Sequence, residues 1–251
     1  NPFIYFNILA TFGFGFVMGL AASMGATMGK IRNPAIASLI AVLVGFMGVY
    51  FSWVVWLYAS SGQTDEAMLV LDPIALFAIL DHLAQQGVWS LKSWTPRGET
   101  LYGIWGLEAL FIVGATVYSV YKGVSSTPFC EDCNAWCDEE LEDKPAGFVT
   151  DAKAFRHALE LGNLTVLGEL DKSNYAQFSR STLYVCPKGT HAGYLSVTNV
   201  QESVNKKGET DEKASSLVEY LTVSDQANLQ SIRDILSVNP FVQAEPTPEA
   251  S

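Results

Sequence analysis

Charged residues are missing from two long stretches of the N-terminal half of the chain. Asp, Glu, Lys and Arg are absent from residues 1–29 and again from residues 34–63. Over all 251 residues the charged share is 16%, whereas an ordinary soluble domain carries roughly 25%. Each stretch exceeds the roughly 20 apolar residues that cross a bilayer. The sequence therefore argues against a soluble fold for this half and predicts membrane-spanning helices.

Signatures of common catalytic and nucleotide-binding sites are also missing. The chain has no G-x-S-x-G, no P-loop, no dinucleotide fingerprint and no H-E-x-x-H. A basic surface is missing too, because 20 acidic residues against 10 basic ones follow Gly123. Such a surface repels nucleic acid rather than binding it. We therefore expect a lipid bilayer and a protein as partners, no nucleic acid, and a protein that is not an enzyme.

Residues 1–122 are predicted to form a transmembrane domain. Its three spans are expected at about 3–28, 35–60 and 100–121. Between the second and third spans, the sequence LDPIALFAILDHLAQQG has an Asp-Pro start and a Gly stop. It predicts an amphipathic helix at about 73–86, lying in the membrane surface.

The orientation of the spans follows from the positions of the basic residues. Lys30 and Arg32 lie in the short linker between the first two spans, and Lys122 follows the third. Lysine and arginine are enriched in cytoplasmic loops. The C-terminal part of the chain is therefore expected on the cytoplasmic side.

The first span carries two GxxxG patterns, Gly15 to Gly19 and Gly25 to Gly29. Small residues four apart make a flat face that lets another helix approach closely in lipid. We expect this face to pack against the second span of the same chain. Dimerisation through the same face is the alternative.

Glu108 is the single acidic residue inside the third span. An ionisable group at that depth is costly and often functional. One interpretation is a proton relay or a pair with a partner subunit. The other is a side chain that reaches back to the interface or is protonated against a hydroxyl group.

Three of the four cysteines lie in TPFCEDCNAWCDEE, just after the third span. Cys130 and Cys133 have the C-x2-C spacing that lets two sulfurs converge on one ion, and Cys186 lies in a predicted turn between two strands. This layout predicts a structural zinc site. We expect Cys137 as the fourth ligand, with His191 as the alternative, because a buried thiolate suits zinc better than an exposed imidazole.

Two other interpretations of the cysteines remain open. C-x2-C is also the thioredoxin pattern, although no βαβ unit precedes it here. The four cysteines could also be unrelated reduced thiols. If the topology were inverted, an oxidising compartment would favour disulfides over zinc.

Residues 123–238 are expected to form a small α+β domain, resembling a zinc ribbon, with a three-stranded antiparallel sheet, and residues 239–251 a disordered tail. The layout resembles small bacterial membrane proteins that carry a zinc ribbon, which implies the bacterial inner membrane. The predicted function is a structural or adaptor subunit whose zinc-stabilised domain docks a partner or associates with copies of itself. The alternatives are a thiol oxidoreductase using Cys130 and Cys133, and a transport subunit using Glu108.

Overall fold

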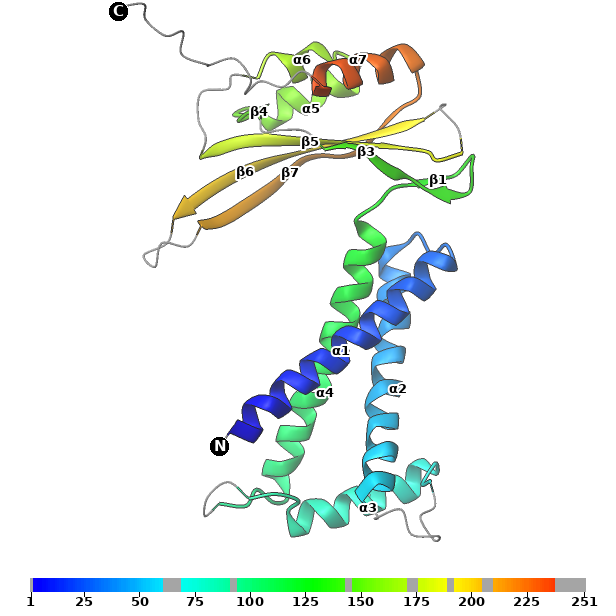
Figure 1. The fold of residues 1–251 in the computed structure, drawn as a ribbon, viewed down its shortest axis with the longest axis vertical. Helices are drawn as coiled ribbons and strands as arrows, with labels where there is room; N and C mark the ends of the chain where they lie inside the picture. The colour runs from blue at the N-terminus through cyan, green and yellow to red at the C-terminus, as the bar shows by residue number, and fades with distance from the viewer. Residues whose placement is uncertain are drawn as a thin grey trace, which may run out of the picture. The chain divides into compact units, whose positions relative to one another are not determined.

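The chain folds into two compact units, residues 1–126 and 127–251, which are described separately (Figure 1). A computed structural model describes residues 2–60, 69–90, 94–142, 146–170, 176–188, 192–204 and 210–237. The expected disordered tail, 239–251, lies outside these residues.

The first unit consists of four helices: α1 (Pro2–Met28), α2 (Pro34–Ser60), α3 (Pro73–Gln86) and α4 (Glu99–Ser125). Three of them are long and apolar enough to cross a membrane, namely α2, α4 and the Leu9–Met28 part of α1. On α2, large apolar side chains remain outside the packed interior and are at least 60% exposed: Leu39, Leu43 and Met47. Such a surface suits contact with lipid, because lipid chains are as apolar as these side chains.

The glycines of α1 pack against α4, not against α2 as the sequence predicts. A Cβ atom added at Gly15 would lie 3.0 Å from Cα of Ile112, and one added at Gly19 would lie 2.5 Å from Cβ of Ser119. The fully buried Thr116 hydroxyl donates to the Gly15 carbonyl at 3.2 Å. The close approach at the glycine places this carbonyl within hydrogen-bond reach of α4.

The second glycine pair of α1 makes no comparable contact within the chain. A Cβ atom at Gly25 would meet nothing within 4 Å, and one at Gly29 would meet only the helix end that it belongs to, with the Gly25 carbonyl at 3.1 Å. Gly45 of α2 approaches α4 in the same way, since a Cβ atom added there would lie 3.0 Å from Cα of Val113. Helix α4 is therefore the helix on which α1 and α2 both pack.

Helix α3 lies across the end of the first unit that holds the C-terminus of α2 and the N-terminus of α4 (Figure 1). The Asp72 carboxylate caps it by accepting from the backbone N–H of Ile74 at 2.7 Å. The Tyr102 hydroxyl donates to the Asp81 carboxylate at 2.7 Å, and the Gly98 N–H donates to the Ala84 carbonyl at 2.8 Å. These bonds attach α3 to the first turns of α4.

The second unit contains a five-stranded antiparallel sheet of order β3-β5-β6-β7, in which β4 pairs with the same edge of β5 as β3. The strands are β3 (Asp138–Glu142), β4 (Ala146–Gly147), β5 (Gln177–Val185), β6 (Gly193–Val204) and β7 (Thr210–Val223). The expectation of three strands is therefore wrong. A separate two-stranded ribbon, β1 (Phe129–Cys130) and β2 (Ala135–Trp136), precedes the sheet.

The two extra strands come from a segment whose acidic composition indicates a linker. Backbone groups of β5 need partners along this edge, and residues 138–142 and 146–147 supply them. The negative charge of Glu140 in β3 is balanced by an ion pair, in which Nε of Arg233 lies 2.9 Å from Oε1 of Glu140. Backbone pairing and one ion pair thus accompany strand formation in an acidic segment.

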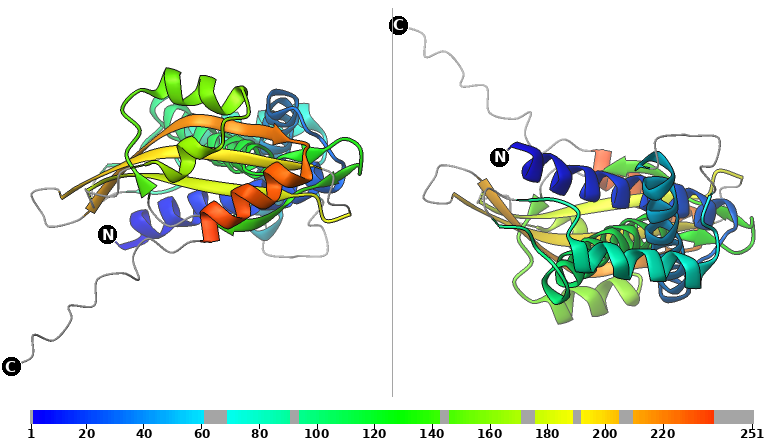
Figure 2. Two further views of the ribbon diagram at one scale, coloured as in Figure 1. Left: turned by 90° about the horizontal axis from the view of Figure 1, so that it is seen from above. Right: turned by 90° about the horizontal axis from the view of Figure 1, so that it is seen from below.

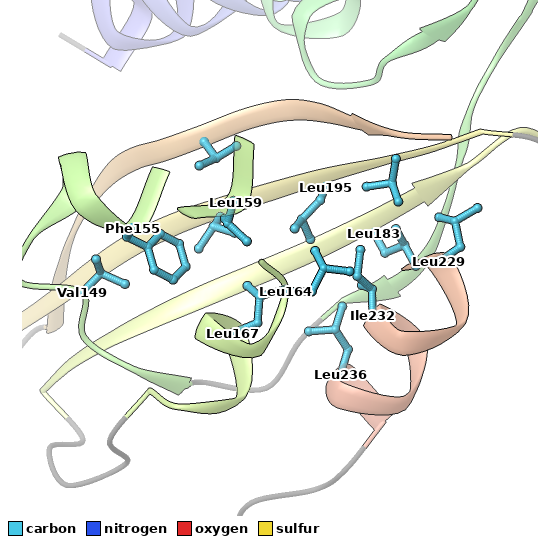
Figure 3. Packing of buried hydrophobic residues seen from close by; sticks show 13 residues of the cluster. Val149, Phe155, Leu159, Leu164, Leu167, Leu183, Leu195, Leu229, Ile232 and Leu236 are labelled. Atoms are coloured by element: carbon cyan, nitrogen blue, oxygen red, sulfur yellow. The ribbon is translucent and has the colours of Figure 1, made fainter. Parts of the chain in front are cut away.

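Helices α5 (Ala152–Glu160), α6 (Thr165–Gly168) and α7 (Gln226–Ser237) all lie on one face of the sheet (Figure 1 and Figure 2). Their apolar residues recur at helical spacing, as with Phe155 and Leu159 on α5. Figure 3 shows these side chains packed against Leu183 and Leu195 from the strands, both fully buried. Each such leucine contributes roughly 1.5–3 kcal/mol.

We expect the change Gly19→Ala to destabilise the helical unit by roughly 1–3 kcal/mol, because the new methyl group overlaps Ser119. Gly13→Ala is the matched control, since it adds the same methyl to α1 where nothing lies within 4 Å. Thermal unfolding of the full chain in detergent, followed by circular dichroism, measures both. Equal unfolding temperatures for the two variants would contradict the packing described.

Candidate metal centre

The β1–β2 ribbon positions Cys130 and Cys133 on a tight turn. Cys130 ends β1 and pairs with Ala135, and Cys133 lies in the turn between them. The chain reverses directly after Cys133 because Asn134 adopts φ 50°, and its N–H donates to the Glu131 carbonyl at 3.2 Å. Asparagine is one of the few residues that tolerates this left-handed conformation. The turn therefore directs both sulfurs to one side.

Strand pairing brings this ribbon to Cys186. The Cys137 N–H donates to the Pro128 carbonyl at 3.0 Å, which extends the ribbon by one residue. Strand β3 starts immediately afterwards, and its first residue, Asp138, pairs with Val185 at the end of β5. Cys137 is thereby placed beside Cys186, although the two residues are far apart in the sequence.

Three sulfurs converge at this point. The Sγ atoms of Cys130, Cys133 and Cys186 all lie within 4.8 Å of one another, which is a spacing that could hold a metal ion. Cys130 and Cys186 are buried, with 1% and 5% exposure, and Cys133 is half-buried. All four cysteines are free thiols. The sequence thus identified three residues that the fold brings together.

The fourth ligand is not decided by this geometry. Cys137 is buried, with 3% exposure, and packs in the same cluster as Cys130 and Cys186. Its sulfur, however, is not one of the three that lie mutually within 4.8 Å. His191 lies outside the described residues. Among the described residues, Cys137 thus has a thiol that packs next to the three sulfurs and could bind a metal.

The electrostatics of the cluster favour protonated thiols until a cation is bound. A hydrogen bond with Cys186 and loss of solvent raise the pKa of Cys133 to about 12. Burial and the charges of neighbouring cysteines raise the pKa of Cys137 to about 11. A thiol that stays protonated near neutral pH is a poor nucleophile. A divalent cation would reverse this balance, because it attracts the thiolate forms and releases their protons.

Two tyrosines that the sequence analysis did not single out pack against the cysteines. Tyr184 and Tyr194 face each other across β5 and β6 and contact the cluster, and burial raises the pKa of Tyr194 to about 12. Tyr184 precedes Cys186 by two positions on an extended chain, so both side chains lie on one face. This period of two is the signal that could have identified Tyr184.

Glu108 and the GxxxG glycines belong to the other unit. Glu108 is half-buried on α4 and lines a cavity in the helical unit. Gly15 and Gly19 contact α4, whereas Gly25 and Gly29 do not approach another helix of the chain within the described residues. None of these residues contributes to the cysteine cluster.

We expect Asn134→Val to destabilise the cysteine-bearing unit by roughly 1–2 kcal/mol, because a β-branched residue opposes φ 50°. Asn134→Gly is the matched control at the same exposed position, since glycine adopts this conformation freely. Thermal unfolding of the full-length chain, monitored by tyrosine and tryptophan near-UV signals, compares the two. Equal stability of the valine and glycine variants would show that the turn does not constrain the cluster.

Known proteins provide no relative with which to compare this cysteine cluster. No family model matches the chain, and no curated protein and no solved structure matches it either.

Proposed function

We propose that the protein is an integral membrane structural or adaptor subunit whose second unit is stabilised by one zinc ion. The observation that carries this proposal is the convergence of the Cys130, Cys133 and Cys186 sulfurs within 4.8 Å. Cys137 is the preferred fourth ligand and His191 the alternative. The proposed location is the bacterial inner membrane, with the second unit in the cytoplasm.

Zinc fits this donor set better than other common ions. Soft thiolates select zinc, copper(I) and iron–sulfur clusters, whereas magnesium and calcium take oxygen ligands. A C-x2-C turn plus a distant cysteine is typical of a structural zinc site. Tyr184 and Tyr194 cover the cysteines, and four protein ligands would leave no open position for a substrate. The role supported is therefore structural.

A structural ion would stabilise the β1–β2 ribbon, which is a small element of the second unit. The β1–β2 ribbon has only two residues in each strand, and a ribbon of this size is marginal in water. Binding of a metal to sites that exist only in the folded chain contributes folding free energy directly. The ion would fix the ribbon to the end of β5.

A docking role for this unit is supported by its charge and by its membrane anchor. The acidic excess after Gly123 gives a surface that favours a basic partner surface.

Raised thiol pKa values at Cys133 and Cys137 oppose the thiol oxidoreductase alternative, since thiolate is the attacking species.

Metal analysis of the purified full-length chain should find about one zinc per chain. Cys186→Ser should remove the zinc, because it deletes the ligand that joins the ribbon to the sheet. Comparison of Cys137→Ser with His191→Ala identifies the fourth ligand, and His157→Ala, an exposed histidine on α5, is the control. Protein without a transition metal, with four rapidly alkylated thiols, would refute the zinc site and favour the oxidoreductase.

Reporter fusions at the C-terminus test the proposed topology. A green fluorescent protein fused after Ser251 should fluoresce, and alkaline phosphatase at the same place should be inactive, because the positive-inside bias retains this end in the cytoplasm. Fusions after the α3 segment, at Trp89, should give the opposite pattern. An active phosphatase at Ser251 would place the cysteines in an oxidising compartment, where disulfides replace zinc.

A further inference from the structure

A cavity in the helical unit is lined by residues that the proposed zinc site does not use. Its volume is about 340 Å³, and it lies among α1, α2, α4 and the segment that follows α3. Four of the chain's 6 tryptophans line it, together with Glu108: Trp53, Trp56, Trp89 and Trp105. Small-molecule sites have volumes of roughly 300–1,000 Å³, so the cavity has room for a small organic group.

Three of these tryptophan rings pack edge to face. Trp53 lies between Trp105, at 4.7 Å and 70°, and Trp56, at 5.6 Å and 78°. Rings that meet at such steep angles present their faces in different directions. Each indole face carries negative electrostatic potential and attracts cations within about 6 Å. A cation bound in the cavity would therefore lie beside several indole rings.

Glu108 also makes the cavity favour a positively charged ligand. Among the described residues that line the cavity, it is the only one with an ionisable side chain. An acidic group in the wall of a cavity attracts a cation bound there. The carboxylate and the indole faces thus select the same kind of ligand by two independent interactions.

The ligand that fits is an organic ammonium ion rather than a metal ion. Calcium takes six to eight oxygen ligands, whereas the oxygen-bearing side chains of the lining are Glu108, Ser52 and Thr11. Quaternary ammonium groups have no N–H groups and are weakly hydrated, and aromatic cages recognise them.

The position of the cavity matches the level of lipid headgroups. Trp53 and Trp56 lie in the last turns of α2, and Trp105 lies in the second turn of α4. Tryptophans at helix ends mark the membrane–water interface. Trp56 and Trp89 remain 41% and 38% exposed, so the cavity is open to ligands from this level. We propose that this cavity binds the ammonium group of a choline-type or ethanolamine-type lipid headgroup or of a free alkylammonium ion.

The test uses the full-length chain in nanodiscs of phosphatidylglycerol, which has no ammonium group. Tetramethylammonium is titrated at constant ionic strength against sodium, and tryptophan fluorescence is recorded. We expect a saturable change for tetramethylammonium and none for sodium. Glu108→Gln and Trp105→Leu should each raise the apparent Kd by about tenfold or more, and Trp105→Phe should raise it less because it keeps a ring face.

Matched controls separate loss of binding from loss of folding. Glu99→Gln changes an exposed acid in the first turn of α4, and Trp94→Leu removes a tryptophan that does not line the cavity. Both should bind as the wild type does. Helical circular dichroism and zinc content are measured for every variant, and if Trp105→Leu misfolds, Glu108→Gln and Trp105→Phe carry the test. The absence of a saturable change, or an unaltered Kd in Glu108→Gln, overturns the proposal.

A second arm distinguishes the source of the ammonium group. In phosphatidylcholine nanodiscs, a headgroup in the cavity competes, so tetramethylammonium should bind with a higher apparent Kd than in phosphatidylglycerol nanodiscs. Equal Kd values in the two lipids indicate a free ion as the ligand. Both results support ammonium binding, and native mass spectrometry of retained phosphatidylcholine in wild type and Glu108→Gln checks the assignment.

Discussion

The arrangement of the second unit depends on the pairing of β3 with the end of β5. Asp138 opposite Val185 is the contact that places the β1–β2 ribbon, and therefore Cys130 and Cys133, beside Cys186. Without that register Cys186 would lie apart from the ribbon that carries Cys130 and Cys133. The pairing joins segments that are distant in the chain, and such contacts cost loop-closure entropy before they contribute stability. A metal ion that binds only the closed arrangement would offset part of this cost.

In the helical unit, the corresponding constraint is close backbone contact in an apolar solvent. Lipid offers no hydrophobic driving force between helices, so packing and hydrogen bonds hold them together. Helix α4 meets α1 at Gly15 and Gly19 and meets α2 at Gly45. The Thr116 hydroxyl also serves its own helix, because it donates to the Ile112 carbonyl at 2.8 Å. The buried Thr116 hydroxyl therefore has hydrogen-bond acceptors on both helices where α1 and α4 pack closely.

The two units carry different chemistry for physical reasons that their composition imposes. Thiols that converge in a water-exposed unit can exchange protons with solvent and take up a soft cation. An acidic side chain and indole rings that line a cavity of the helical unit instead suit the organic cation proposed above. Acids beside the cysteines, such as Asp138, raise thiol pKa values and at the same time attract a divalent ion.

The sequence by itself determined the features that are local along the chain. Two uncharged runs longer than a bilayer predict the first two apolar helices, and a third apolar stretch that contains Glu108 predicts the last, because each helix satisfies its own backbone hydrogen bonds. The C-x2-C spacing likewise predicted that Cys130 and Cys133 act together, since a four-residue turn suffices to bring their sulfurs together. The position of α3 follows from its Asp-Pro start, since Asp72 caps the helix within its own first turn.

Only the tertiary structure decided which distant segments meet. Gly15 and Gly19 of α1 meet Thr116 and Ser119 of α4, and small residues alone do not specify a partner. Residues 138–142 and 146–147 form strands that pair with backbone groups of β5. Trp89 joins Trp53 and Trp105 around Glu108 from three separate segments. Spacing along the chain encodes contacts over a few residues, whereas these contacts depend on how complete helices and strands pack.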